Sequence, residues 1–327
     1  MRTIQAEPKE NSRRAILRWA AGGFAARPAA GESAGPRTRR VAVRYEVTLP
    51  DDAKSPVSLW LPAPQSDAHQ RIDRLRFSGA GRHRIEDGRS DRNRYFFTEA
   101  PAGRTVTMEF DVVRTERRGE FTPPRVAPAR PDCCVGPDRL VPLDRRIRSW
   151  AGDVARSAGA RTDLEKARAI YEHVVETVKY DKSGRGWGRG DLYYACDARR
   201  GNCSDFHAIF IGYARALGIR AKFVIGLPFP RDRRSGEIAG YHCWAEFFAR
   251  EIGWLPVDAS EAAKDPPRRR YFFGSLDEHR VALTVGRDVI LTPRQAGRPL
   301  NFFVYPYAEA GGRPAGELPC RITFAEF

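Results

Sequence analysis

One cysteine in this chain stands where a sequence can prepare a nucleophile. Gly201 and Asn202 come directly before Cys203, and asparagine is among the best residues for capping the start of a helix. Apolar residues then recur at helical spacing until a glycine ends the pattern: Phe206, Phe210, Tyr213, Leu217, Gly218. Cys203 is therefore predicted to be the first or second residue of a buried helix. A thiol there faces the positive end of the helix dipole and free backbone N–H groups, which lower its pKa and favour the thiolate.

Two later segments carry the groups that a thiolate needs as partners. Residues 240–248 and 253–258 are rich in aromatic and apolar residues and predict two neighbouring strands. If these strands form a hairpin that turns at residues 249–251, counting along them places His242 directly opposite Asp258 on one face. Their Cβ atoms would then lie about 5 Å apart. That is the geometry that a base and its orienting carboxylate require.

Taken together, the three segments resemble the transglutaminase-like superfamily of papain-like cysteine enzymes. The matching blocks are R-G-N-C-S-D-F around Cys203, Y-H-C-W-A-E-F around His242 and G-W-L-P-V-D-A-S around Asp258, within residues 143–292. The resemblance implies an α+β fold, with a papain-like core of helices packed on an antiparallel sheet. It also implies Cys203 as the nucleophile, His242 as general base and then acid, and Asp258 as the group that orients the imidazole.

The resemblance further implies a group that holds the oxyanion. In papain-like enzymes an upstream aromatic or amide side chain often does this, so Trp187 and Tyr194 are candidates, and Trp244 is a candidate for the cleft. The backbone N–H of Cys203 is the other donor, because the start of a helix leaves that N–H without an intrahelical partner. This chemistry needs no cofactor and no metal.

A zinc site is the first alternative chemistry. Cys203 and His207 stand four residues apart on the predicted helix, and His242 and Cys243 follow later. Neighbouring strand residues point to opposite faces, so the latter two are poorly placed to bind one ion, and no CxxC pair is present. We therefore set zinc aside and expect His207 to be a buried packing residue. Asp205, a rival for the third catalytic position, is expected to serve as a cap or in an ion pair.

A non-catalytic module that binds a peptide or glycan in the same groove is the second alternative. A free cysteine is often only a small buried hydrophobe. A binding module, however, has no reason to keep cysteine, histidine and aspartate together. Within the enzyme class we expect hydrolysis of a peptide or isopeptide bond by a protease or amidase. Protein cross-linking or glutamine deamidation comes second, and in either case the expected partner is a protein or peptide substrate.

The remaining sequence predicts the elements around this site. Residues 39–120 form several short runs of alternating apolar and polar residues separated by turns, which predicts a small all-β, sandwich-like domain. Residues 121–142 are rich in proline and predict a linker or strap. Residues 143–327 are assigned to the catalytic domain, and the Thr162–Glu165 capping box opens its long helix.

Composition narrows the choice of partners. The chain has 327 residues and a net charge of +15, but its basic residues are scattered, so we expect no nucleic-acid partner, only attraction to an anionic envelope component. No run approaches the ~20 apolar residues of a membrane span. Beyond Cys203, five cysteines remain, and an odd number cannot all pair internally. Their pairing stays open: a bond between the adjacent pair would be strained, and one of that pair could instead reach Cys196 or Cys320 (the five are Cys133, Cys134, Cys196, Cys243, Cys320).

Residues 1–34 resemble a twin-arginine export signal. The motif S-R-R-A-I-L-R at 12–18 is followed by a weakly apolar run and by small residues at 29–31 that offer a cleavage site. A disordered basic N-terminus is the alternative. The expected location is periplasmic or secreted.

Overall fold

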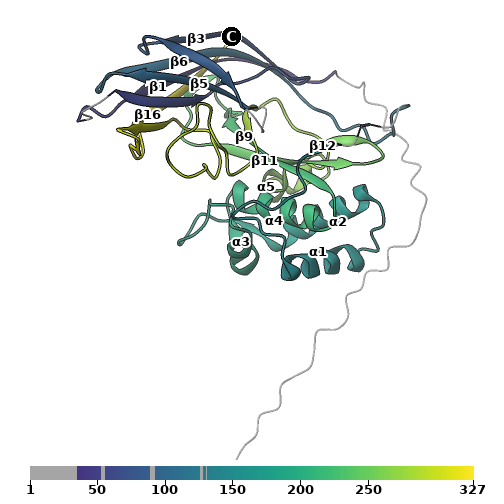
Figure 1. The fold of residues 1–327 in the computed structure, drawn as a ribbon. Coiled ribbons are helices and arrows are strands. Elements are labelled where there is room, and N and C mark those ends of the chain that lie inside the picture. Colours follow the sequence, from purple (N-terminus) through teal and green to yellow (C-terminus); the bar gives the residue numbers. More distant parts are fainter. Residues whose placement is uncertain (1–34, 53–55, 89–92, 126–127, 130) are drawn as a thin grey trace, which may run out of the picture. The chain divides into compact units, whose positions relative to one another are not determined.

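The computed structural model describes residues 35–52, 56–88, 93–125, 128–129 and 131–327. These residues form mixed helices and antiparallel sheets, which confirms the α+β class (Figure 1). No helix in these described ranges is both long enough and apolar enough to cross a membrane. The export signal predicted for residues 1–34 lies outside the described residues.

Two five-stranded antiparallel sheets make up the all-β region. The strand order of the first is β10 (Ser235–Glu237), β16 (Cys320–Glu326), β1 (Thr38–Thr48), β6 (Thr105–Thr115), β3 (Gln70–Ser78). The order of the second is β15 (Arg313–Pro314), β14 (Tyr307–Ala310), β2 (Val57–Pro62), β5 (Arg94–Ala100), β4 (His83–Asp87). The sheets share one apolar core, in which the rings of Phe77 and Phe96 stack with centroids 4.1 Å apart.

The alternation seen in the sequence is what packs these sheets. Along β1 every second residue is buried, so Val41, Val43 and Tyr45 face the core while the residues between them face outward. A strand with one apolar face can be buried on one side only, which favours a two-layer arrangement.

The C-terminus differs from the expected domain boundary. Residues 307–326, assigned above to the catalytic domain, form β14, β15 and β16, and these strands belong to the two sheets of the all-β region. Val43 pairs with Phe324, and Trp60 pairs with Tyr307. Alternation in a short strand shows that it has a buried face, but it does not show which of several sheet edges it will join.

The region that carries the candidate site is built around a third sheet and a buried helix. The sheet has the order β12 (Gly253–Val257), β11 (His242–Ala249), β9 (Arg220–Pro228), β13 (Arg280–Val285). Helix α4 (Cys203–Ala216) packs on β9 and β11, and the other helices contact it (Figure 1). These are α1 (Arg145–Ser157), α2 (Asp163–Thr177), α3 (Leu192–Ala198) and α5 (Ala259–Lys264), with the 3₁₀ turn η1 (Pro266–Arg268) after α5.

Every residue of α4 from 203 to 215 is buried. A helix that is largely apolar all round can be stable only in such a position, and α4 is therefore the central helix of this region. The predicted Thr162–Glu165 capping box opens α2, which ends at Thr177. Two short strands, β7 (Lys179–Tyr180) and β8 (Arg200–Gly201), pair in parallel just before α4.

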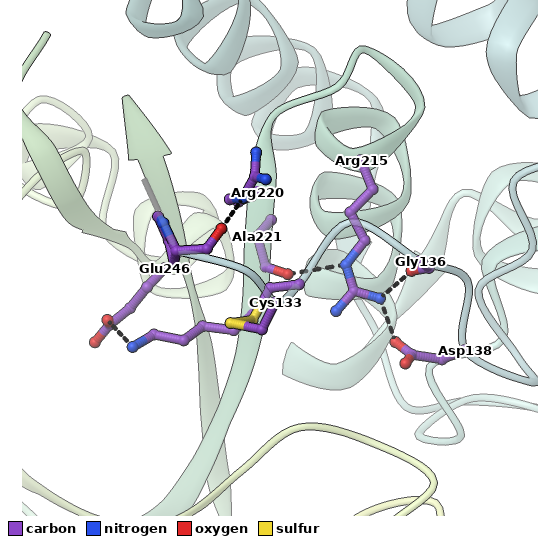
Figure 2. The surroundings of a disulfide bond; sticks show 10 residues. Cys133, Gly136, Asp138, Arg215, Arg220, Ala221 and Glu246 are labelled. Atoms are coloured by element: carbon purple, nitrogen blue, oxygen red, sulfur yellow. Dashed lines mark hydrogen bonds and ion pairs between the residues drawn. A yellow bond between two sulfur atoms is a disulfide. The ribbon is translucent and has the colours of Figure 1, made fainter. Parts of the chain in front are cut away.

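The segment 131–138 lies against the end of α4 and the start of β9 (Figure 2). Cys133 and Cys134 form a disulfide with each other, which settles the pairing that the sequence left open for this pair. The Ala221 N–H donates to the Cys134 carbonyl at 2.9 Å. Arg215 donates to the Gly136 carbonyl at 2.9 Å and to Asp138 at 2.7 Å. The end of the proline-rich stretch is thus a strap fixed to the site-bearing region.

Candidate active site

The cap of α4 sets the position of Cys203. The Asn202 side chain accepts the Ser204 N–H at 2.9 Å, and the Asp205 carboxylate accepts the Asn202 N–H at 2.9 Å, which completes a capping box. Cys203 is consequently the first residue of the helix, as predicted, and only 2% of its surface is exposed. The cap uses the N–H groups of its neighbours and leaves the Cys203 N–H free of that role.

Asp205 has a second task besides capping. Its carboxylate also accepts the N–H of Gly188 at 2.7 Å and that of Gly190 at 3.1 Å. The carboxylate therefore ties the 182–190 loop to the first turn of α4. This agrees with the expectation that Asp205 is a cap and not a member of the histidine pair.

His242 and Asp258 meet, although the predicted register of their hairpin is wrong. Ala249 pairs with Gly253, so the turn lies at residues 250–252, one position later than expected. Gly253 has φ of +109°, a conformation that favours glycine and closes the turn there. Each residue of β11 is thus paired two positions further along, and His242 lies diagonal to Asp258. A shift by an even number keeps both side chains on one face, and His242 Nε2 lies 2.7 Å from Asp258 Oδ2.

Four donors surround the buried carboxylate of Asp258. One oxygen accepts the Ser260 hydroxyl and the Glu261 N–H, each at 2.9 Å, so that Asp258 caps α5. The other oxygen accepts His242 and the guanidinium of Arg280, the latter at 2.6 Å. Burial would raise the pKa of Asp258, but the charges of His242 and Arg280 outweigh it and hold this pKa well below its ordinary value.

The imidazole of His242 is also close enough to the Cys203 sulfur for each group to shift the pKa of the other. Because Nε2 contacts Asp258, Nδ1 is the ring atom left to face the sulfur. Burial lowers the pKa of His242, but the charge and hydrogen bond of Asp258 prevail and raise it to about 10. Burial raises the pKa of Cys203, but hydrogen bonds from Cys243 and His242 and the imidazolium charge hold it well below its ordinary value. At neutral pH the pair is a thiolate and an imidazolium.

His207 connects the start of α4 to the start of α5. Its Nδ1 lies 2.7 Å from the Cys203 carbonyl, and its Nε2 accepts the Ala259 N–H at 3.2 Å. These partners assign the proton to Nδ1 and leave the ring neutral, and burial lowers its pKa accordingly. His207 is the buried packing residue that was expected. Since both ring nitrogens are occupied, it is not available as the metal ligand of the zinc alternative.

One trio of side chains has ligand atoms within 4.8 Å of one another: His242, Asp258 and Glu261. Arg280 donates to the same Asp258 oxygen that His242 contacts. A cation at this point would face the buried guanidinium charge, so the donor set suits an imidazolium better than a metal ion.

The three weaker candidates occupy different positions. Trp187 lies in the loop tied down by Asp205, with the Lys182 ammonium 5.9 Å from its ring centroid. Tyr194 packs against the same loop, where a Cβ on Gly186 would come within 2.8 Å of its ring. Trp244 is buried beside His242, with ring centroids 6.3 Å apart, and its indole N–H has no partner among the described residues. A role in holding the oxyanion stays a prediction for the first two, and a place in the cleft stays a prediction for Trp244.

Sequence reasoning missed two residues of the site. The Tyr241 hydroxyl contacts the Asn202 amide and the Ser204 hydroxyl, each at 2.9 Å, which joins β11 to the cap of α4. Arg280 bridges Asp258 and Asp277, the latter at 3.1 Å. Tyr241 directly precedes His242, which is a usable signal. Arg280 is the first residue of an otherwise mostly apolar strand, and the sequence around it does not indicate which carboxylate it pairs with.

A family model matches the part of the chain that holds the site. Residues 148–259, which include all three proposed catalytic positions, match the family model of the transglutaminase-like superfamily. An uncharacterised protein from Haemophilus influenzae is 25% identical over 316 residues, covering 83% of this chain and 85% of that protein.

Solved structures give a second comparison. A protein from Cytophaga hutchinsonii, described there as a proposed cysteine protease, superposes with a TM-score of 0.55 at 15% identity, covering 89% of this chain and 98% of that one. This likeness shows a shared fold. The periplasmic domain of TgpA from Pseudomonas aeruginosa gives a TM-score of 0.34 at 15% identity, covering 70% of this chain and 90% of that one. A TM-score this low does not show a shared fold.

Proposed function

We propose that this chain, whose residues 148–259 match the family model of the transglutaminase-like superfamily, is a cysteine-dependent enzyme acting on amides through a thioester. One observation carries the proposal. A single buried imidazole, that of His242, lies 2.7 Å from the Asp258 carboxylate and close enough to the Cys203 sulfur to lower the pKa of that thiol. Sulfur, imidazole and carboxylate from distant parts of the chain are thus arranged as a nucleophile, a proton carrier and an orienting group.

The reaction follows from the protonation states. The Cys203 thiolate attacks the carbonyl carbon of an amide, and the N–H of Cys203 stabilises the oxyanion at the head of α4. His242, held as an imidazolium by Asp258, gives its proton to the leaving amine as the C–N bond breaks. The neutral imidazole then takes a proton from water, the resulting hydroxide attacks the thioester, and the thiolate is released.

We propose a peptide or isopeptide bond as the substrate, which makes the enzyme a protease or amidase. Cys203 is 2% exposed and His242 6% exposed. A nucleophile this buried favours water as the acceptor over the side chain of a second protein. Cross-linking or glutamine deamidation is the alternative outcome, and a module that binds peptide or glycan without chemistry is the alternative of another class.

Thiol labelling tests the catalytic assignment without a known substrate. Iodoacetamide at pH 7 is expected to alkylate Cys203 faster than Cys196, a half-buried thiol whose pKa is raised by burial. His242→Ala should slow the labelling of Cys203 by about 30-fold, because a thiol of ordinary pKa is only about 3% thiolate at pH 7. Cys196→Ala is the matched control and should leave that rate unchanged. Labelling indifferent to His242 would favour the binding module.

A second assay separates hydrolysis from transfer. The protein is incubated with a glutamine-bearing protein and a labelled primary amine. New N-termini without incorporated amine support the protease, whereas incorporated amine that disappears in Cys203→Ser supports the transglutaminase alternative.

Export to the periplasm or medium is proposed on the sequence of residues 1–34 alone. A twin-arginine route would carry the folded protein, with its buried thiolate already assembled. Fusion of these residues to a reporter, with Arg13 and Arg14 both changed to Lys as the control, tests that route.

A further inference from the structure

The proposed chemistry leaves one buried thiol beside the nucleophile without a task. Cys243 follows His242 on β11 and is completely buried. Its sulfur lies 3.7 Å from the Ser204 hydroxyl and 3.8 Å from His207 Nδ1, two groups in the first two turns of α4. The Cys203 and Cys243 thiols are also close enough to shift each other's pKa, that of Cys203 downward and that of Cys243 upward. Cys243, forty residues further along the sequence, is therefore buried against the helix that begins with the buried Cys203.

The two sulfurs differ in protonation. Burial and the neighbouring Cys203 raise the pKa of Cys243 well above its ordinary value, so Cys243 remains a thiol. Cys203 is the thiolate, and it is the sulfur that an oxidant attacks first. A thiolate with a second thiol close by is the arrangement in which an oxidised cysteine is resolved as a disulfide.

We propose that peroxide converts Cys203 and Cys243 into a reversible disulfide that switches the site off. The Cys203 thiolate attacks one oxygen of hydrogen peroxide, the O–O bond breaks, and after protonation a sulfenic acid and one water result. The Cys243 sulfur then attacks the sulfenic sulfur. The S–S bond forms, the S–O bond breaks, and hydroxide leaves with the Cys243 proton as a second water. Two thiols lose two electrons in all, and one peroxide gains them.

The consequence for the enzyme follows from geometry. The disulfide removes the Cys203 sulfur from His242 and blocks attack on a substrate. It also stops oxidation before the irreversible sulfinic stage, and a dithiol restores the original pair. The loss of activity rests on the proposed function, but formation of the disulfide can be measured without a substrate.

The chain offers matched controls for this idea. Cys133 and Cys134 already form a disulfide, and Cys196 and Cys320 are free, half-buried thiols on α3 and β16. Cys196→Ala removes a thiol outside the Cys203–Cys243 pair and should behave as the wild type. Cys243→Ser keeps the size of the side chain and serves where Cys243→Ala lowers stability.

The experiment exposes the full chain to hydrogen peroxide, blocks free thiols with N-ethylmaleimide and maps the peptides by mass spectrometry. The wild type is expected to yield a linked Cys203–Cys243 peptide, and dithiothreitol should restore the labelling of Cys203. In Cys243→Ser, Cys203 should proceed to sulfinic and sulfonic acid, with irreversible loss at least about tenfold greater.

Two results would overturn the proposal, and they point to different errors. If Cys203 is oxidised rapidly to sulfinic acid in both proteins and no linked peptide forms, Cys243 does not resolve it, and the proposed function still stands. If Cys203 is oxidised no faster than Cys196, it is not a thiolate, and the proposed function fails as well.

Discussion

The two regions of this protein differ in the kinds of side chain that fill their interiors. In the all-β region the side chains packed between the two sheets are mostly apolar, although the region also buries Arg39, Asp111 and Arg114. Arg44 of β1 lies outside, with 48% of its side chain exposed. Around α4, the interior holds buried carboxylates, imidazoles and the guanidinium of Arg280. The stability of a packed apolar side chain depends on how well its volume fills the space available, whereas that of a buried charge depends on the specific groups that pair with it. A substitution near α4 should therefore affect both the chemistry of the site and the stability of the fold. A substitution in the sandwich should affect stability alone.

The largest effect is expected for Asp258→Asn. The substitution leaves the buried charges of His242 and Arg280 without their shared counter-charge, which costs about 3–5 kcal/mol of the free energy of unfolding. The pKa of His242 falls with it, so alkylation of Cys203 at pH 7 should slow by about 10- to 100-fold. Urea unfolding and iodoacetamide labelling measure the two quantities.

The control for this variant is Ser260→Ala, which removes one neutral donor to Asp258 and should cost about 1 kcal/mol. An Asp258→Asn protein that labels like the wild type would break the comparison, because the site would not then depend on its buried charge.

A cavity in the core of the sandwich should lower stability without changing the reactivity of Cys203. Met108 of β6 is fully buried, and Met108→Ala should cost about 2–5 kcal/mol of the free energy of unfolding. The labelling rate of Cys203 in the folded protein should be unchanged. Arg44→Ala, at an exposed ion pair with Glu109, should cost less than about 1 kcal/mol. Slower labelling in the Met108 variant would mean that packing in the sandwich also sets the geometry of the site.

The smallest and most diagnostic effect is the dependence of stability on pH. The folded pKa of Asp258 lies below its ordinary value, so its contribution is present above pH about 4 and is lost as the pH falls. The folded pKa of His242 is raised to about 10, so its contribution is present below pH about 6.5 and is lost as the pH rises through 10.

The pair should therefore contribute most between pH about 4 and 6.5. Urea midpoints measured from below pH about 4 to pH about 10 should show the wild-type profile in Met108→Ala and a flatter one in Asp258→Asn. Equal profiles in the two variants would contradict the assignment of the pH dependence to the His242–Asp258 pair.

Several parts of the site could be predicted because they depend on near neighbours in the sequence. The Asn202 cap, the helical spacing after Cys203 and the role of His207 one turn below it follow from contacts within a few residues. The hairpin prediction brought the right two residues to one face with the wrong register, because a turn can shift by one position without changing which side chains face inward.

By itself, the sequence determined where α4 begins, which strand faces are buried and which three residues belong to the family's signature blocks. Packing of the whole chain set the rest: β14 and β16 complete the N-terminal sheets, Arg280 shares an oxygen of Asp258 with His242, and Cys243 lies against Ser204 and His207 of α4. The difference lies in how far apart in sequence the interacting residues are. Caps and periodicity are local properties of the backbone, whereas sheet edges and buried charge partners are selected by the packing of the whole chain.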